Sequence, residues 1–88
     1  MATRGKIIFT EYAESQIIER KIAREDVINV LQSPEQITVG RKGRKIAQSK
    51  LKKGGQDGLL RIIFEEENKI NKIVITVYWT SKVQKYWR

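Results

Sequence analysis

The spacing of the apolar residues changes partway along the chain, and this change sets the class of fold. Before Ser33-Pro34 the apolar residues recur at helical intervals, whereas after it apolar and polar residues alternate as they do in strands. The residue before a proline disfavours the helical conformation, so Ser33 is the expected end of a helix. The chain therefore divides into a helical first part and a stranded second part.

The helical part is expected to open with a short strand over residues 6–10 and to continue as two helices. Thr10 suits the N-cap of the first helix, because its hydroxyl can accept a hydrogen bond from a free backbone N–H. The second helix is expected to begin at Ala23, which lacks a capping oxygen. Strands are then expected over residues 36–40, 44–51, 59–66 and 73–80, with a short helix over residues 81–88.

These elements predict an α+β domain with a short N-terminal strand, two helices and an antiparallel sheet of about four strands, both helices lying on one face. Alternation assigns the side chains of the last strands to faces. The residues expected beneath the helices are Leu60, Ile62 and Phe64, followed by Ile73, Ile75, Val77 and Trp79. The residues expected on the opposite, open face include Arg61, Val74, Thr76, Tyr78 and Thr80.

The length and composition exclude several kinds of site. At 88 residues the chain has room for one domain, residues 1–88. Without cysteine or histidine we expect no disulfide, metal site or cofactor, and acid–base chemistry must use carboxylates, lysine, tyrosine or arginine. The start does not resemble a signal peptide, and the longest apolar run, residues 73–79, is too short to cross a membrane, so we expect a cytoplasmic protein without a membrane partner.

The positive charge lies almost wholly in the second half of the chain. Residues 1–40 carry five basic and six acidic side chains, whereas residues 41–88 carry thirteen and four. Residues 41–53 alone hold seven basic side chains and no acidic one. Such one-sided charge is typical of a protein that binds a polyanion, either nucleic acid or an acidic protein. The alternative is a surface that is basic only for solubility.

Cationic and aromatic side chains gather on the expected open face. Arg61 is flanked by apolar residues in its strand, and Tyr78 lies in the neighbouring strand. Guanidinium groups bind phosphate oxygens and aromatic rings stack on unpaired bases, so the group suits a nucleic acid. Its other members are Arg44 and Lys50 from the basic strand and, from a helical C-terminal segment, Lys82, Lys85 and Tyr86.

The same side chains suit cleavage of RNA without a metal ion. That reaction needs a base for the ribose 2′-OH, positive charge near the phosphate and an acid for the departing 5′-oxygen. Arg61 can supply the charge, and lysine or tyrosine with a lowered pKa can transfer protons. In the structural alternative, Arg61 pairs with Glu65 or Glu66 and the tyrosines are half-buried packing residues.

Short motifs along nearly the whole chain carry a family resemblance. In the first half they are Tyr12-Ala13, Glu19-Arg20-Lys21-Ile22, Glu25-Asp26-Val27 and Ser33-Pro34-Glu35. In the second half they are Gly40-Arg41-Lys42-Gly43-Arg44, Leu60-Arg61-Ile62-Ile63-Phe64, Ile75-Thr76-Val77-Tyr78, Ser81-Lys82 and Lys85-Tyr86-Trp87. With these motifs the chain resembles an uncharacterised prokaryotic family within the RelE/ParE-like toxin superfamily. It is similar, more loosely, to BrnT-type toxins.

The resemblance implies a single RelE-like domain that is partnered by an acidic antitoxin protein and, in active members, cleaves mRNA on or off the ribosome. ParE-like members act on DNA gyrase instead. Relatives often have a histidine where this chain has Tyr12. Together with the open-face group, the resemblance predicts catalytic roles for Arg61, Lys82, Lys85 and Tyr86, and nucleic-acid contacts for Arg41, Arg44, Lys50 and Tyr78.

The expected function is therefore a metal-independent mRNA endoribonuclease of a toxin–antitoxin module, with RNA or the ribosome as its target. Two alternatives from other classes stay open. One is a module that binds nucleic acid or the ribosome without cutting, and the other is a ParE-like toxin whose basic cleft receives an acidic protein segment.

Overall fold

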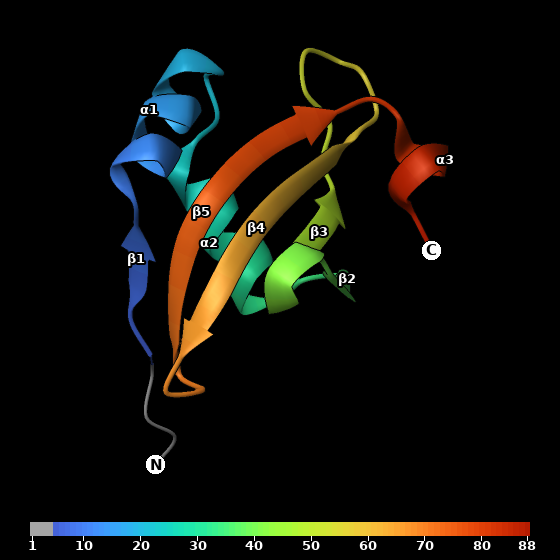
Figure 1. Cartoon of the computed structure of the whole chain (residues 1–88). Coiled ribbons are helices and arrows are strands. Elements are labelled where there is room, and N and C mark those ends of the chain that lie inside the picture. The colour runs from blue at the N-terminus through green and yellow to red at the C-terminus, as the bar shows by residue number, and fades with distance from the viewer. Residues whose placement is uncertain (1–4) are drawn as a thin grey trace.

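The computed structural model describes residues 5–88, in which a five-stranded sheet carries two helices on one face (Figure 1). The elements are β1 (Ile7–Phe9), α1 (Glu11–Glu19), α2 (Arg24–Gln32), β2 (Gln36–Val39), the 3₁₀ turn η1 (Arg41–Gly43), β3 (Lys45–Lys50), β4 (Leu59–Glu67), β5 (Asn71–Thr80) and α3 (Val83–Tyr86). The strand order is β1-β5-β4-β3-β2, with β1 parallel to β5 and the other pairs antiparallel. The predicted α+β fold is confirmed.

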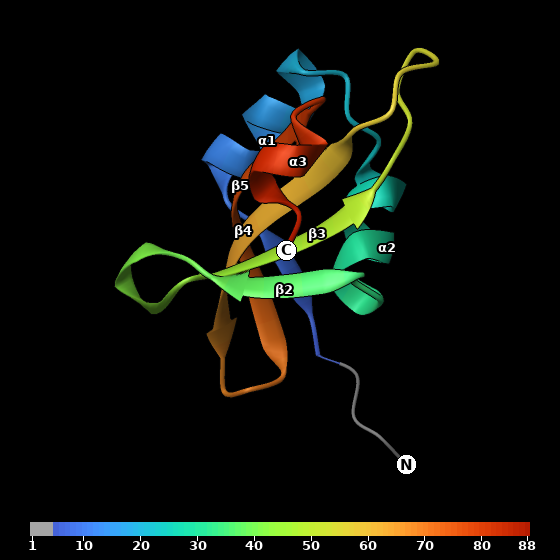
Figure 2. The same ribbon diagram turned by 90° about the vertical axis from the view of Figure 1, so that its right-hand side faces the viewer.

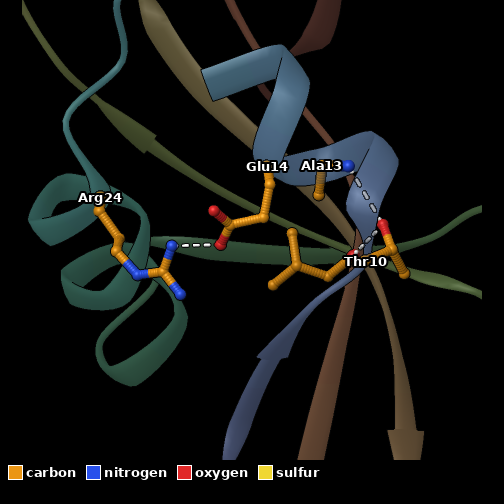
Figure 3. A network of polar contacts seen from close by, with 5 residues as sticks. Thr10, Ala13, Glu14 and Arg24 are labelled. Atoms are coloured by element: carbon orange, nitrogen blue, oxygen red, sulfur yellow. Dashed lines mark hydrogen bonds and ion pairs between the residues drawn. The ribbon is translucent and has the colours of Figure 1, made fainter. Parts of the chain in front are cut away.

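Thr10 joins the start of α1 to the sheet, as Figure 3 shows. Its hydroxyl accepts a hydrogen bond from the Ala13 N–H at 3.1 Å and donates one to the carbonyl of Val74 in β5 at 3.0 Å. At the start of α2, Arg24 forms an ion pair with Glu14 of α1 (Figure 3). Thr10 is therefore the N-cap of α1, as predicted, and it also anchors this helix to β5.

Replacing Thr10 with alanine should lower the free energy of unfolding by about 1–2 kcal/mol, because the cap and the bond to β5 are lost together. Urea denaturation followed by circular dichroism measures this loss. Thr10→Ser is the matched control, since it keeps the hydroxyl and should retain most of the stability. Equal stability of Thr10→Ala and the unchanged protein would contradict this role.

The hydrophobic core lies between the sheet and the helices α1 and α2. Its β4 members, Leu60, Ile62 and Phe64, are at most 1% exposed, as the alternation predicts. The helices contribute Ala13, Ile17, Val27, Val30 and Leu31. Burial of this apolar surface holds the helices on one face and leaves the other face of the sheet free to carry polar side chains.

The alternation prediction is wrong for the first half of β5. The pairing with β4 shifts by one residue, so that Ile75 has no partner and forms a β-bulge. Val74 is therefore fully buried in the core, whereas Ile73 falls on the open face. Beyond the bulge, Val77 and Trp79 face the helices as predicted.

Candidate functional site

The last residues of the chain, 81–88, turn back over the face of the sheet opposite α1 and α2 (Figure 2). Gln36 of β2 donates from Nε2 to the Arg88 carbonyl at 2.7 Å and accepts from the Arg88 N–H at 3.1 Å. Gln48 of β3 donates to the Tyr86 carbonyl at 3.0 Å. A one-turn helix such as α3 is not stable alone, so these contacts to the sheet hold it in place.

Arg61 of β4 lies beneath this C-terminal segment. Its Nε donates to Gln48 Oε1 at 2.9 Å, and its Nη1 donates to the Tyr78 hydroxyl. The guanidinium carbon lies 3.9 Å from the centroid of the Tyr86 ring and 5.6 Å from that of Tyr78. Arg61 does point away from α1 and α2, but the expectation that it is uncovered is wrong, because α3 leaves it only 7% exposed.

The charge of Arg61 has no carboxylate partner among the residues that the structure describes. Glu65, one of the two acids considered as partners, binds Arg44 at 2.9 Å, and the other, Glu66, binds Lys45. A buried charge is costly unless it is paired or hydrogen-bonded. The two hydrogen bonds and two ring faces around Arg61 stabilise it without neutralising it.

One edge of the Arg61 guanidinium is open to a ligand. Nε and Nη1 are occupied, whereas Nη2 makes no hydrogen bond within residues 5–88. No side-chain nitrogen or oxygen in that range is both fully buried and without a partner, so Nη2 is not fully buried and belongs to the small exposed part of Arg61. An arginine that is held in one orientation with an accessible N–H group is preorganised for an anion such as a phosphate oxygen.

Two exposed lysines lie against aromatic rings of the C-terminal segment. Lys85 Nζ lies 5.3 Å from the centroid of the Tyr86 ring, and Lys50 Nζ lies 4.6 Å from that of the Trp87 ring. The structure thus brings together five predicted site residues, Lys50, Arg61, Tyr78, Lys85 and Tyr86. With Gln48 and Trp87 we name this group the arginine cluster.

The two tyrosines of the arginine cluster differ in acidity. Burial raises the pKa of Tyr78, and the charge of Arg61 offsets only part of that rise. Burial also acts to raise the pKa of Tyr86, but the ammonium of Lys85, the Tyr78 hydroxyl and the charge of Arg61 outweigh it, so this pKa lies below its ordinary value. Tyr78 therefore stays protonated while Tyr86 ionises more readily.

The structure does not bring the other predicted residues into the cluster. Lys82 precedes α3 and is exposed, its backbone N–H donates to the Thr80 hydroxyl at 3.1 Å, and its side chain makes no hydrogen bond within residues 5–88. Arg41 and Arg44 lie at the β2–β3 connection, at the edge of a separate hollow on the open face. Arg44 is also occupied by its ion pair with Glu65.

Sequence reasoning missed the part played by Gln36 and Gln48. Gln48 is fully buried and donates from Nε2 to Gln36 Oε1 at 2.8 Å as well as to the backbone of α3. Each glutamine alternates with apolar or small neighbours in its strand, which is the signal that places it on the open face. The cross-strand register that aligns both glutamines with Arg61 is not visible in the sequence.

Residues 5–88 contain no group of three His, Cys, Asp or Glu side chains that could hold a metal ion. Glu65 and Glu66, which are adjacent in sequence, are taken up by separate basic partners. No helix within this range has the length and apolar character needed to cross a bilayer.

Comparison with known proteins identifies the family. No curated protein and no solved structure matches the chain. A family model described as Domain of unknown function (DUF4258) matches residues 9–79, which include Arg61 and Tyr78 and end before the C-terminal segment. Because the match covers most of the 88 residues, the chain belongs to the family Domain of unknown function (DUF4258).

Proposed function

We propose that the protein is a RelE-like toxin domain that binds RNA at the arginine cluster and cleaves it without a metal ion. The observation that carries this proposal is the Arg61 guanidinium, which is fixed by Gln48 and Tyr78, lacks a carboxylate partner within residues 5–88 and has an Nη2 group that is neither hydrogen-bonded within that range nor fully buried. The charge of +8 supports a polyanionic substrate in the cytoplasm and an acidic antitoxin partner.

The proposed reaction is an attack of the ribose 2′-oxygen on the adjacent phosphorus. The 2′-OH loses its proton to a base, the new O2′–P bond forms and the P–O5′ bond breaks. The products are a 2′,3′-cyclic phosphate and a 5′-hydroxyl, and the 5′-oxygen takes its proton from an acid.

The two tyrosines suit the two proton transfers. Groups whose environments push their pKa values apart are typical of an acid–base pair. Tyr86, with its lowered pKa, is the proposed base, and Tyr78, with its raised pKa, is the proposed acid. The two rings are neighbours, with centroids 6.4 Å apart, so both tyrosines belong to one site. Arg61 and Lys85 supply the positive charge that stabilises the phosphate as negative charge builds up on its oxygens.

Incubation of the purified protein with single-stranded RNA in the presence of EDTA tests the proposal. We expect fragments that end in 2′,3′-cyclic phosphate and begin with a 5′-hydroxyl, formed with or without ribosomes. Lys21→Asn is a suitable control, because it removes one positive charge on the helical side at a left-handed position (φ 55°) that asparagine tolerates. RNA that stays intact under both conditions would contradict cleavage. Salt-dependent binding without cutting would indicate a non-catalytic module instead.

The cleavage rate should rise with pH as Tyr86 loses its proton, with a midpoint below the value of about 10 that is usual for tyrosine. Lys85→Ala should move this midpoint to higher pH, because the ammonium that stabilises the phenolate is lost. The ultraviolet absorbance of tyrosinate measures the same ionisation directly. Lys82→Ala is the control on the same segment and should leave the midpoint unchanged. If Tyr86 titrates identically in Lys85→Ala and in the unchanged protein, the Lys85 ammonium is not what lowers the pKa of Tyr86.

A further inference from the structure

A hollow of about 480 Å³ lies on the open face beside the arginine cluster. Its floor is formed by Ile46, Ile63 and Thr76, which are paired with one another across β3, β4 and β5. Its rim is formed by Gly40, Arg41, Lys42 and Arg44 around the turn η1. The hollow therefore combines a mostly apolar floor with a cationic rim.

The hollow adjoins the arginine cluster on the open face of the sheet. Each floor residue lies two positions along its strand from a member of the cluster, as Ile63 does from Arg61 and Thr76 from Tyr78. Two residues along a strand span about 7 Å and return to the same face. A ligand that holds one group at Arg61 can therefore place its next group over Ile63.

The rim of the hollow carries two basic side chains that are not engaged in ion pairs within the described range. Arg44 is paired with Glu65, whereas Arg41 and Lys42 form no ion pair with any other residue in the described range. Gly40 keeps the space open, because a Cβ atom at this position would lie 3.3 Å from Ile46 Cδ1. The hollow thus presents a mostly apolar floor beside two basic side chains that have no ion-pair partner in the described range.

We propose that this hollow seats a nucleobase, so that the protein holds two successive phosphates of a single strand with a base between them. This inference rests on the proposed binding of RNA at Arg61. One phosphate lies at the arginine cluster, the base lies on Ile46, Ile63 and Thr76, and the next phosphate lies at Arg41 and Lys42. A base in a duplex is stacked and paired and cannot enter, so the hollow selects for single strands.

Several features of the hollow match a nucleobase. The two faces of a base are apolar and can lie against Ile46 and Ile63. Its edge carries hydrogen-bonding groups, for which the Thr76 hydroxyl and the rim offer partners. Stacking of a base on an aromatic ring is worth about 1–3 kcal/mol and tolerates different sequences, and contact with the aliphatic floor of the hollow is expected to lie at the lower end of that range. The hollow is therefore expected to add affinity without strong sequence preference.

Comparison of two uncleavable ligands tests the inference. One is a fluorescent 2′-deoxy tetranucleotide, and the other is a deoxyribose-phosphate chain of the same length without bases. Fluorescence anisotropy should show that the base-containing ligand binds the unchanged protein about tenfold more tightly, as expected for one seated base. Ile63→Ser should remove most of that difference, whereas Ile18→Ser, at a position 74% exposed on α1, should leave it unchanged.

The outcomes separate the inference from the proposed function. Arg61→Gln should weaken the binding of both ligands, because both carry phosphates. Equal affinity of the two ligands for the unchanged protein would contradict the binding of a nucleobase in the hollow, while phosphate binding at Arg61 would stand. A failure of both ligands to bind would contradict the proposed function and, with it, the binding of a nucleobase in the hollow. Circular dichroism checks whether Ile63→Ser remains folded, and the comparison in the unchanged protein does not depend on any variant.

Discussion

Replacement of Arg61 with lysine should lower the rate of RNA cleavage by a factor on the order of 10² to 10³, the usual effect of losing one oriented donor to a transition state. Lysine keeps the charge but has no planar fork. It cannot bind Gln48 and Tyr78 as Arg61 does and still present a third fixed N–H to the phosphate. The measurement is the initial rate at saturating RNA, with cyclic-phosphate ends as the readout.

The control for this prediction is the same substitution on the other side of the sheet. Arg24 pairs with Glu14 between α1 and α2, so Arg24→Lys keeps the charge there and should cleave at the unchanged rate. Thermal unfolding of both variants shows whether a lost rate reflects lost structure. Cleavage by Arg61→Lys at the rate of the unchanged protein would contradict the role given to the guanidinium.

Val74→Asn should lower the free energy of unfolding by about 3–5 kcal/mol, which adds the loss of a buried apolar side chain to the cost of an unsatisfied amide. Val74 is 0% exposed, because the bulge at Ile75 turns it into the core. Ile73 precedes Val74 and lies on the open face, so Ile73→Asn should lower the free energy of unfolding by only about 1 kcal/mol. Urea denaturation of the two variants measures the difference. The opposite order of stabilities would show that β5 has no bulge.

The helices and most strands could be predicted because their signals are local. Thr10 caps α1 through its own hydroxyl, and Ser33-Pro34 ends α2 at the expected place. The bulge in β5 has no such signal. Residues 73–75 are all apolar and β-branched, so they suit a strand on either face. Only the pairing with β4 decides that Val74, and not Ile75, enters the core.

The candidate site could be predicted only in part. Arg61 and Tyr78 belong to antiparallel strands that follow one another in the chain, so alternation was enough to place them on the open face. The cover over Arg61 could not be predicted, because α3 has only one turn and no local stability. Its position depends on Gln36 and Gln48, which come from two different strands and act only once the sheet has formed.

Nuclear magnetic resonance of the arginine side chains tests the central claim most directly, namely that the open edge of Arg61 binds an RNA phosphate. The Nε–Hε signal of Arg61 is identified by its disappearance in Arg61→Lys. Upon titration with an uncleavable dinucleotide, that signal should shift in proportion to the fraction bound, because Nε and Nη2 belong to the same guanidinium. A dinucleotide that binds and shifts other arginine signals while the Arg61 signal stays in place would contradict the claim.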